Sequence, residues 1–298
     1  MIKLNLNIEI NYLIDVNGAD FICNIHAANT HYQVVSMENL HINQSIPYRI
    51  DKDLKHGNRY LRFTALPGPL KIIYTATIEV AHYRIRSNDL MEVPVRNLPL
   101  SVIEYLYPSR YCQSDRFIRL AIKEFGNLPQ GYSRVKAIQE WVRRQVTFTQ
   151  NVSNSNTSAL DTFIEQQGIC RDFSHLMIAL CRAVNIPARF TTGTDYGANP
   201  CLGPPDFHAY VEVYLSGRWY IFDPSGTAIP MGFIRLGTGR DAADVSFATI
   251  FGNVQSQSPI IHAVAVEDSK FGFVAPYYCE EALSTDDERP LPYNPSGN

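Results

Sequence analysis

The sequence lacks the features that mark several large classes of protein. Its six cysteines include no Cys-x-x-Cys pair, so neither a zinc site nor a disulfide framework is indicated. No apolar run approaches the length of a transmembrane helix, and no internal repeat is present. Positive charge is not in excess either, because 26 Lys and Arg face 29 Asp and Glu for a net charge of −3. This balance argues against nucleic acid or an anionic membrane as the main partner.

The chain also lacks an apolar block at its start. Residues 1–7 alternate between polar and apolar types, unlike a signal peptide. Six scattered cysteines in a chain of this length fit a reducing compartment, so we expect a cytoplasmic protein. The composition, 45% hydrophobic and 18% charged, is typical of a soluble globular protein. With 298 residues, the chain is long enough for two ordinary domains.

Residues 1–98 have the pattern of short β-strands. Residues 2–10 alternate strictly between apolar and polar side chains, which predicts a half-buried strand. Turn-forming residues at 56–58 and 67–69 separate further strands. Together these segments predict an antiparallel β-sandwich. The predicted strands cover residues 2–10, 21–27, 32–36, 60–64, 71–80 and 81–85.

The pattern becomes helical after two prolines within residues 93–99, which indicate a linker. Strands return at residue 188, and a Gly- and Pro-rich loop covers residues 195–205. Residues 284–298 are charged and rich in proline, which predicts a flexible tail. The predicted helices cover residues 114–125, 133–145, 158–167 and 170–184, and the predicted later strands cover 188–193, 206–215, 218–224 and 259–266.

Cys170 lies at the start of a predicted amphipathic helix, two residues after Gly168. The unpaired N–H groups and the dipole at a helix N-terminus favour a thiolate, which is the nucleophilic form of cysteine. Cys181 lies on the apolar stripe of the same helix and is expected in the core. The other four cysteines are expected to be unreactive, although Cys201 in the Gly- and Pro-rich loop could be exposed.

A base and an orienting carboxylate follow on two predicted strands. If the loop after Leu215 has two residues, Leu215 pairs with Arg218, and His208 and Asp223 fall on one face as diagonal neighbours. An odd loop length would place them on opposite faces. A carboxylate bound to one imidazole nitrogen leaves the other nitrogen free to take a thiol proton. The sequence thus contains a nucleophile, a base and an orienting group.

Other titratable residues near these positions are weaker candidates for the base or its partner. His175 lies about 140° around the helix from Cys170, so it is a poor base and is expected to pack or cap. Asp206 is a rival partner for His208, but it flanks the start of the strand. Glu212 shares a strand face with His208 and is expected to have a structural role.

Three separated motifs resemble the bacterial transglutaminase-like superfamily, a group of papain-like cysteine hydrolases and acyl transferases. The motifs are Gly-Ile-Cys-Arg-Asp-Phe-Ser-His at 168–175, Asp-Phe-His-Ala-Tyr-Val-Glu-Val-Tyr at 206–214 and Gly-Arg-Trp-Tyr-Ile-Phe-Asp-Pro at 217–224. Residues 182–189 and 239–245 also match. The first ~100 residues resemble the β-sandwich that precedes the core in many members.

The resemblance implies an α+β fold and a set of roles. An N-terminal antiparallel β-sandwich, residues 1–98, would precede a papain- or transglutaminase-like core, residues 99–283, with helices packed on an antiparallel sheet. Cys170 would be the nucleophile, His208 the base and Asp223 the orienting group. Residues 244–252 resemble the family stretch that follows the site, and we expect them to shape the substrate cleft.

The sequence indicates one of the two donors of an oxyanion hole and leaves alternatives for the other. The backbone N–H of Cys170 is the natural first donor. Animal transglutaminases use a tryptophan upstream of the cysteine, but Trp141 lies on a predicted helix of its own and cannot be placed at the site. The papain pattern of a glutamine six residues before the cysteine is absent, because Ile164 stands there. Gln150 and Asn151 are the alternatives.

These observations predict acyl transfer through a thioester, without a metal or other cofactor, because no calcium loop is present. Water as the acceptor would make the protein a cysteine protease or amidase, which we favour because most bacterial relatives are described as proteases. An amine as the acceptor would make it a transglutaminase or ligase. A non-catalytic peptide-binding module is the third alternative. In each case the expected partner is a peptide or protein.

Overall fold

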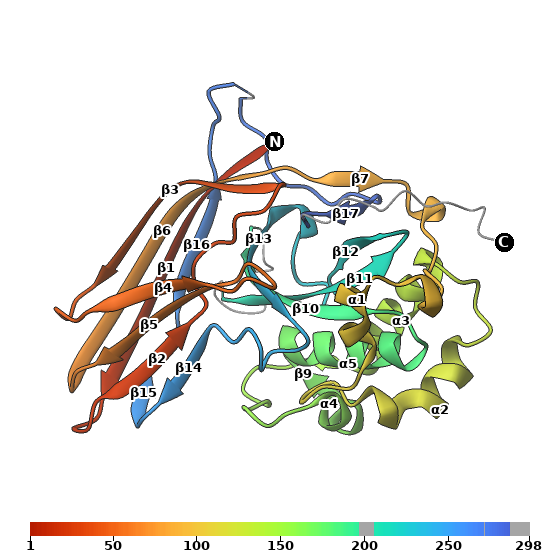
Figure 1. Cartoon of the computed structure of the whole chain (residues 1–298), viewed down its shortest axis with the longest axis horizontal. Helices are drawn as coiled ribbons and strands as arrows, with labels where there is room; N and C mark the ends of the chain where they lie inside the picture. The colour runs from red at the N-terminus through yellow and green to blue at the C-terminus, as the bar shows by residue number, and fades with distance from the viewer. Residues whose placement is uncertain (197–205, 271, 287–298) are drawn as a thin grey trace.

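A computed structural model describes residues 1–196, 206–270 and 272–286 of the chain. A β-sandwich forms one half of the molecule, and a sheet covered by helices forms the other (Figure 1). The predicted α+β fold is therefore confirmed. Cys201, most of the expected loop at 195–205 and residues 287–298 of the expected tail lie outside the described residues.

No helix among the described residues is both long enough and apolar enough to cross a membrane.

The first sheet of the sandwich is built on the alternating segment at the start of the chain. β1 pairs with β6 along its whole length, from Ile2 opposite Val80 to Ile14 opposite Gly68. Alternate apolar residues of both strands are buried, because side chains on one face of a strand meet the core. The sheet contains β15 (Val254–Ser256), β1 (Ile2–Ile14), β6 (Gly68–Val80) and β3 (Gln33–Ile42) in that order, with β16 (Ile260–Ala265) also paired to β1.

The second sheet packs its apolar face against the first. Phe21 stacks on Phe63 with ring centroids 5.0 Å apart, and Tyr12 of the first sheet lies 5.2 Å from Phe21. The sheet contains β14 (Ala248–Phe251), β2 (Ala19–Cys23), β5 (Arg59–Ala65) and β4 (Tyr48–Lys52) in that order. The sequence did not predict β4, whose residues are mostly exposed and lack a clear alternation of apolar side chains.

Three late strands complete the sandwich. β14 pairs with β2, and β15 and β16 both pair with β1 (Figure 1). The sequence placed residues 248–265 in the core range 99–283, whereas these strands extend the two N-terminal sheets. A strand pattern predicts that a segment is extended but does not specify its partner, so this long-range pairing was not foreseen.

The other half of the molecule is an antiparallel sheet with helices on one face (Figure 1). Helix α5 packs on β10 and β11, and almost all of its side chains are buried. The sheet contains β12 (Arg218–Phe222), β11 (His208–Leu215), β10 (Ala188–Asp195) and β13 (Phe233–Gly239) in that order. The helices are α2 (Ser114–Phe125), α3 (Tyr132–Gln145), α4 (Ala159–Glu165) and α5 (Cys170–Ala183).

Short elements connect the two halves. The predicted linker around residues 93–99 contains one short helical turn at 95–97 and leads into a second helical element at 100–103. The remaining elements are β7 (Tyr83–Ile85), η1 (Ser87–Asp89), η2 (Val95–Asn97), α1 (Leu100–Ile103), η3 (Glu104–Leu106), β8 (Thr147–Phe148), β9 (Gln167–Gly168), η5 (Pro230–Gly232) and β17 (Ala282–Ser284). β17 pairs with β7, so residues 284–286 are packed and not part of a flexible tail.

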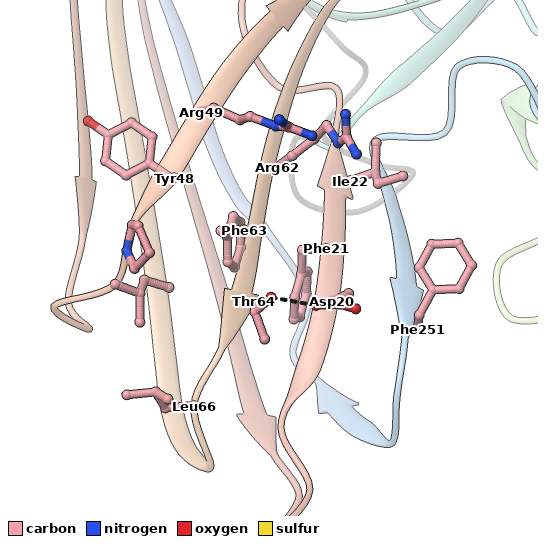
Figure 2. A pocket seen from close by; sticks show the side chains of 12 residues that line it. Asp20, Phe21, Ile22, Tyr48, Arg49, Arg62, Phe63, Thr64, Leu66 and Phe251 are labelled. Carbon is pink, nitrogen blue, oxygen red and sulfur yellow. Dashed lines mark hydrogen bonds between the residues drawn. The ribbon is translucent and has the colours of Figure 1, made fainter.

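The outer face of the second sandwich sheet carries a groove (Figure 2). Arg49 and Arg62 lie opposite each other in the ladder and both contact Asp51, at 3.2 and 3.1 Å. The exposed ring of Phe251 lines the same groove from β14. None of the three predicted site residues lines this groove.

A buried ionic network joins the core sheet to the sandwich. The Glu212 carboxylate accepts hydrogen bonds from Arg189 at 2.8 Å and from Arg235 at 3.0 Å. The backbone N–H of Arg235 donates to the Gln33 side chain of β3 at 2.8 Å. Burial alone would raise the pKa of Glu212, but the two arginines lower it to about 2. The structural role expected for Glu212 agrees with these contacts.

We predict that Glu212→Gln lowers the free energy of unfolding by about 3 kcal/mol, because it leaves the buried guanidinium group of Arg235 without a counter-charge and leaves Asp286 as the remaining carboxylate partner of Arg189. Urea unfolding at neutral pH measures the effect. Glu9→Gln, which breaks a partly exposed pair with Lys71, is the control and should cost less than about 1 kcal/mol. Equal losses in the two variants would contradict this account of the network.

Candidate active site

Cys170 is the first residue of α5, and the residues around it form a capping unit. The carboxylate of Asp172 accepts a hydrogen bond from the backbone N–H of Ile169 at 2.9 Å. Gly168 leaves room for this carboxylate, because a Cβ there would lie 2.7 Å from the Cβ of Asp172. The Gly-Ile-Cys-Arg-Asp sequence therefore fixes the helix start, where the dipole favours an anion such as a thiolate.

A short parallel pairing brings a second segment beside Cys170. β8 pairs with β9, and the N–H of Thr149 donates to the carbonyl of Gly168 at 2.9 Å. Gln150 and Asn151 follow directly, so they lie next to the approach to the helix. Asn151 has φ 62°, a left-handed conformation that asparagine tolerates. Gln166, the residue that ends α4, has the same left-handed conformation, with φ 56°.

The hairpin of β11 and β12 brings His208 and Asp223 together. Leu215 pairs with Arg218, which confirms the predicted two-residue turn, and both turn residues have positive φ, as a type I′ turn requires. The ladder continues to Val211 opposite Phe222, so Asp223 follows the last pair. His208 Nε2 lies 3.4 Å from Asp223 Oδ1, and both side chains are buried.

The Asp223 carboxylate is held on every side. Oδ1 accepts hydrogen bonds from the Ser225 hydroxyl at 2.6 Å and from the Ser225 backbone N–H at 3.0 Å. Oδ2 accepts from the N–H of Ala228 at 3.1 Å. The backbone carbonyl of Asp223 accepts from Gln139 at 2.6 Å and Arg143 at 3.0 Å, both on α3. These contacts fix the carboxylate in position and orientation.

The charges of the site support one another. Burial alone would lower the pKa of His208, but the neighbouring Cys170 and Asp223 raise it well above its ordinary value. Burial would raise the pKa of Asp223, whereas its hydrogen bonds, first of all with His208, lower it. Because Asp223 engages Nε2, the Nδ1 atom of His208 is the one left for the thiol.

Two further contacts link the start of α5 to the start of β11. The Ser174 hydroxyl donates to the Cys170 carbonyl at 2.9 Å and also lies 3.2 Å from the carbonyl of Ala209, beside His208. The Cys170 thiol lies 3.9 Å from the carbonyl of Phe207. The helix and the strand are thus held together where the candidate nucleophile and base meet.

Two of the weaker candidates have other partners. His175 is fully buried and stacks on Tyr111, and its Nε2 accepts the N–H of Ala242 at 3.2 Å. Burial, with Arg171 nearby, lowers its pKa well below the ordinary value. Asp206 is exposed, and its carboxylate accepts the N–H of the next residue at 2.6 Å.

Trp141 packs among the helices of the core. Its ring lies 5.9 Å from Phe125 and 6.2 Å from Phe163, measured between ring centroids. Its indole is therefore part of the helical layer rather than of the site.

The described cysteines differ in exposure. Cys170 and Cys279 are half-buried, whereas Cys23, Cys112 and Cys181 are fully buried. Burial raises the pKa of the Cys23 thiol to about 12, and it also raises the pKa values of Cys112 and Cys181.

Ser174, Gln139 and Arg143 were not singled out from the sequence. Ser174 lies four residues after Cys170, a spacing that places the two on one side of the helix and could have drawn notice. Gln139 and Arg143 are also four residues apart on α3, but their contact with Asp223 depends on tertiary packing that no local pattern encodes.

The sequence matches two described families. Residues 120–224 match the transglutaminase-like superfamily, and residues 2–101 match the bacterial transglutaminase N-terminal domain. A crystal structure of a candidate cysteine protease from Cytophaga hutchinsonii is 38% identical, covers 95% of this chain and 97% of its own chain, and superposes with a TM-score of 0.87.

Two curated relatives match over part of their length. An uncharacterized protein of Mycobacterium leprae is 24% identical over 180 residues, which are 59% of this chain and 63% of the relative. The uncharacterized protein YebA of Bacillus subtilis is 28% identical over 194 residues, which are 57% of this chain and 26% of the relative. The chain therefore spans less than two thirds of either relative. The two family matches and the full-length likeness to the Cytophaga structure show that this chain belongs to the transglutaminase-like superfamily, with a bacterial transglutaminase N-terminal domain.

Proposed function

We propose that this protein hydrolyses a peptide or amide bond through a thioester on Cys170. The observation that carries the proposal is the buried His208–Asp223 pair, 3.4 Å apart, beside the half-buried thiol of Cys170 at the start of α5. This arrangement supplies a nucleophile, a base and an orienting carboxylate. The description of the Cytophaga relative as a candidate cysteine protease supports the same chemistry.

The proposed reaction proceeds in two steps. His208 Nδ1 takes the thiol proton, and the thiolate attacks the amide carbon to form a tetrahedral oxyanion. The C–N bond breaks as the imidazolium returns the proton to the leaving amine, which gives the thioester. A water molecule then loses a proton to His208 and attacks the thioester carbon. The C–S bond breaks, the carboxylic acid leaves, and the thiol is restored.

Gln150 is the proposed second oxyanion donor, beside the backbone N–H of Cys170. It follows Thr149, whose N–H is bonded to the carbonyl of Gly168. Asn151, the other candidate from the sequence, has the backbone conformation of a turn residue, so its proposed role is structural.

The same thioester could be resolved by an amine, which would make the protein a transglutaminase. The family to which the chain belongs makes this the second candidate. Incubation with a casein or glutamine-peptide substrate, with and without a primary amine such as cadaverine, separates the two by mass spectrometry. Cleaved or deamidated products in both samples support hydrolysis, whereas a product carrying the amine shows transfer.

The first prediction concerns the thiol itself. Iodoacetamide should label Cys170 faster than Cys23, Cys112 or Cys181, because those three thiols are buried and protonated. His208→Ala should slow the labelling of Cys170 at neutral pH by roughly tenfold, since the imidazolium no longer stabilises the thiolate. Peptide mapping by mass spectrometry at several pH values measures both. Labelling of Cys170 no faster than that of the buried thiols would contradict the enzyme assignment and favour a peptide-binding module.

The second prediction concerns the pH dependence of turnover. The leaving amine needs the imidazolium of His208, whose pKa is raised by Cys170 and Asp223, so activity is retained until the pH passes that raised value. Asp223→Asn removes one of the two negative charges. The alkaline limb of kcat/KM should therefore move to lower pH by about one unit or more. Asp206→Asn is the matched control, and an equal shift in that variant would contradict the role given to Asp223.

The third prediction tests the oxyanion donor. Gln150→Ala should lower kcat by about 10²-fold with a smaller change in KM, because the lost hydrogen bond forms only with the developing oxyanion. Alkylation of Cys170 by iodoacetamide should be unchanged, since that reaction forms no oxyanion. Asn151→Ala, assayed beside it, should retain more activity, and the reverse order would assign the donor to Asn151.

A further inference from the structure

A pair of stacked aromatic rings lies beside the candidate nucleophile. Phe207 directly precedes His208, and its carbonyl oxygen is 3.9 Å from the Cys170 thiol. Its ring stacks on that of Phe247, with centroids 4.5 Å apart and an angle of 13° between the planes. Phe207 is half-buried, and Phe247 is 38% exposed. A partly exposed apolar surface therefore includes the side chain of the residue whose carbonyl contacts the Cys170 thiol.

The β-sandwich holds this pair in place. The backbone carbonyl of Phe247 accepts the N–H of Asn24, which directly follows β2, at 2.9 Å. β14 begins at the next residue and pairs with β2. Phe207 also packs against the hydrophobic core of the sandwich. The two rings are thus fixed by the N-terminal half of the chain, although the reactive groups belong to the other half.

We propose that Phe207 and Phe247 form an apolar subsite that accepts an aromatic or large aliphatic side chain of the acyl donor. Exposed aromatic rings fixed beside polar reactive groups are typical of a substrate pocket, where apolar walls supply affinity and the polar groups supply chemistry. Because an extended peptide advances about 3.3 Å per residue, the first or second residue on the acyl side of the reacting carbonyl reaches the pair. The proposal rests on the proposed function of Cys170 and names the substrate class that the site prefers.

Peptidyl acyloxymethyl ketones test this subsite, because they alkylate the thiol after binding as an acyl donor does. Four dipeptidyl probes are needed, with phenylalanine or aspartate at the first or the second position from the ketone. Intact-mass spectrometry gives the second-order rate constant for each. We expect phenylalanine to be preferred by about tenfold or more at one of the two positions, from burial of the aromatic ring.

Three variants make the test specific. Phe247→Ala should reduce the preference at least fivefold, and Phe247→Leu should keep part of it because an apolar wall remains. Phe251→Ala is the matched control: it removes a more exposed phenylalanine four residues further on, in the groove of Figure 2, and should leave the preference unchanged.

Labelling by iodoacetamide separates this inference from the proposed function, because that small reagent does not occupy the subsite. If iodoacetamide labels Cys170 normally but the wild type prefers phenylalanine at neither position, the subsite is wrong and the nucleophile stands. If Phe247→Ala keeps the full preference for phenylalanine, the subsite is also wrong and the nucleophile again stands. The stacked rings would then serve only to pack the two halves of the molecule together. If iodoacetamide itself does not label Cys170 selectively, the proposed function fails first.

Discussion

The hydrogen bond between His208 and Asp223 is the contact on which the rest of the candidate site depends. The two residues come from neighbouring strands, and only an even loop length in the hairpin places them on one face. The turn has positive φ at both Ser216 and Gly217, a conformation that glycine adopts without strain and that few other residues adopt at all. One inserted residue in this turn would rotate Asp223 away from the imidazole. The local chemistry of a surface turn therefore decides whether a buried pair forms.

The sandwich is joined to the half of the chain that holds the candidate site by several contacts. The chain leaves the core sheet after β13, and β14 joins the second sandwich sheet beside β2. Phe247 lies just before β14, so the segment that returns to the sandwich runs past the reactive groups. The side-chain amide of Gln33 on β3 makes two hydrogen bonds with the backbone of Arg235 in the core sheet. Its Nε2 donates to the Arg235 carbonyl and its Oε1 accepts the Arg235 N–H, both at 2.8 Å. These contacts hold the sandwich against the sheet that carries His208.

Local sequence patterns predicted most of the helices and strands, and they also predicted that His208 and Asp223 lie together. The alternation at residues 2–10 and the two-residue turn after Leu215 each follow from side-chain period and turn chemistry, and both are present as expected. The pairing partners of the late strands could not be predicted from the sequence. Their hydrogen bonds join residues more than 200 positions apart, and neither segment has a local pattern that identifies its partner. The contacts of Gln139 and Arg143 with Asp223 were not predicted for the same reason. Two polar residues four positions apart on a helix are as consistent with a solvent-exposed face as with a tertiary contact.

The buried ionic network near the site also has an electrostatic consequence. Glu212 lies on the same strand face as His208, four residues further along β11. An uncompensated carboxylate at that place would add to the negative potential at the imidazole, because interactions between buried charges are weakly screened. Arg189 and Arg235 bind Glu212, and Arg189 also contacts Asp286 at 2.8 Å, so two cations face two carboxylates. With Glu212 balanced in this way, the neighbours that raise the pKa of His208 are Cys170 and Asp223, the two residues proposed to act with it.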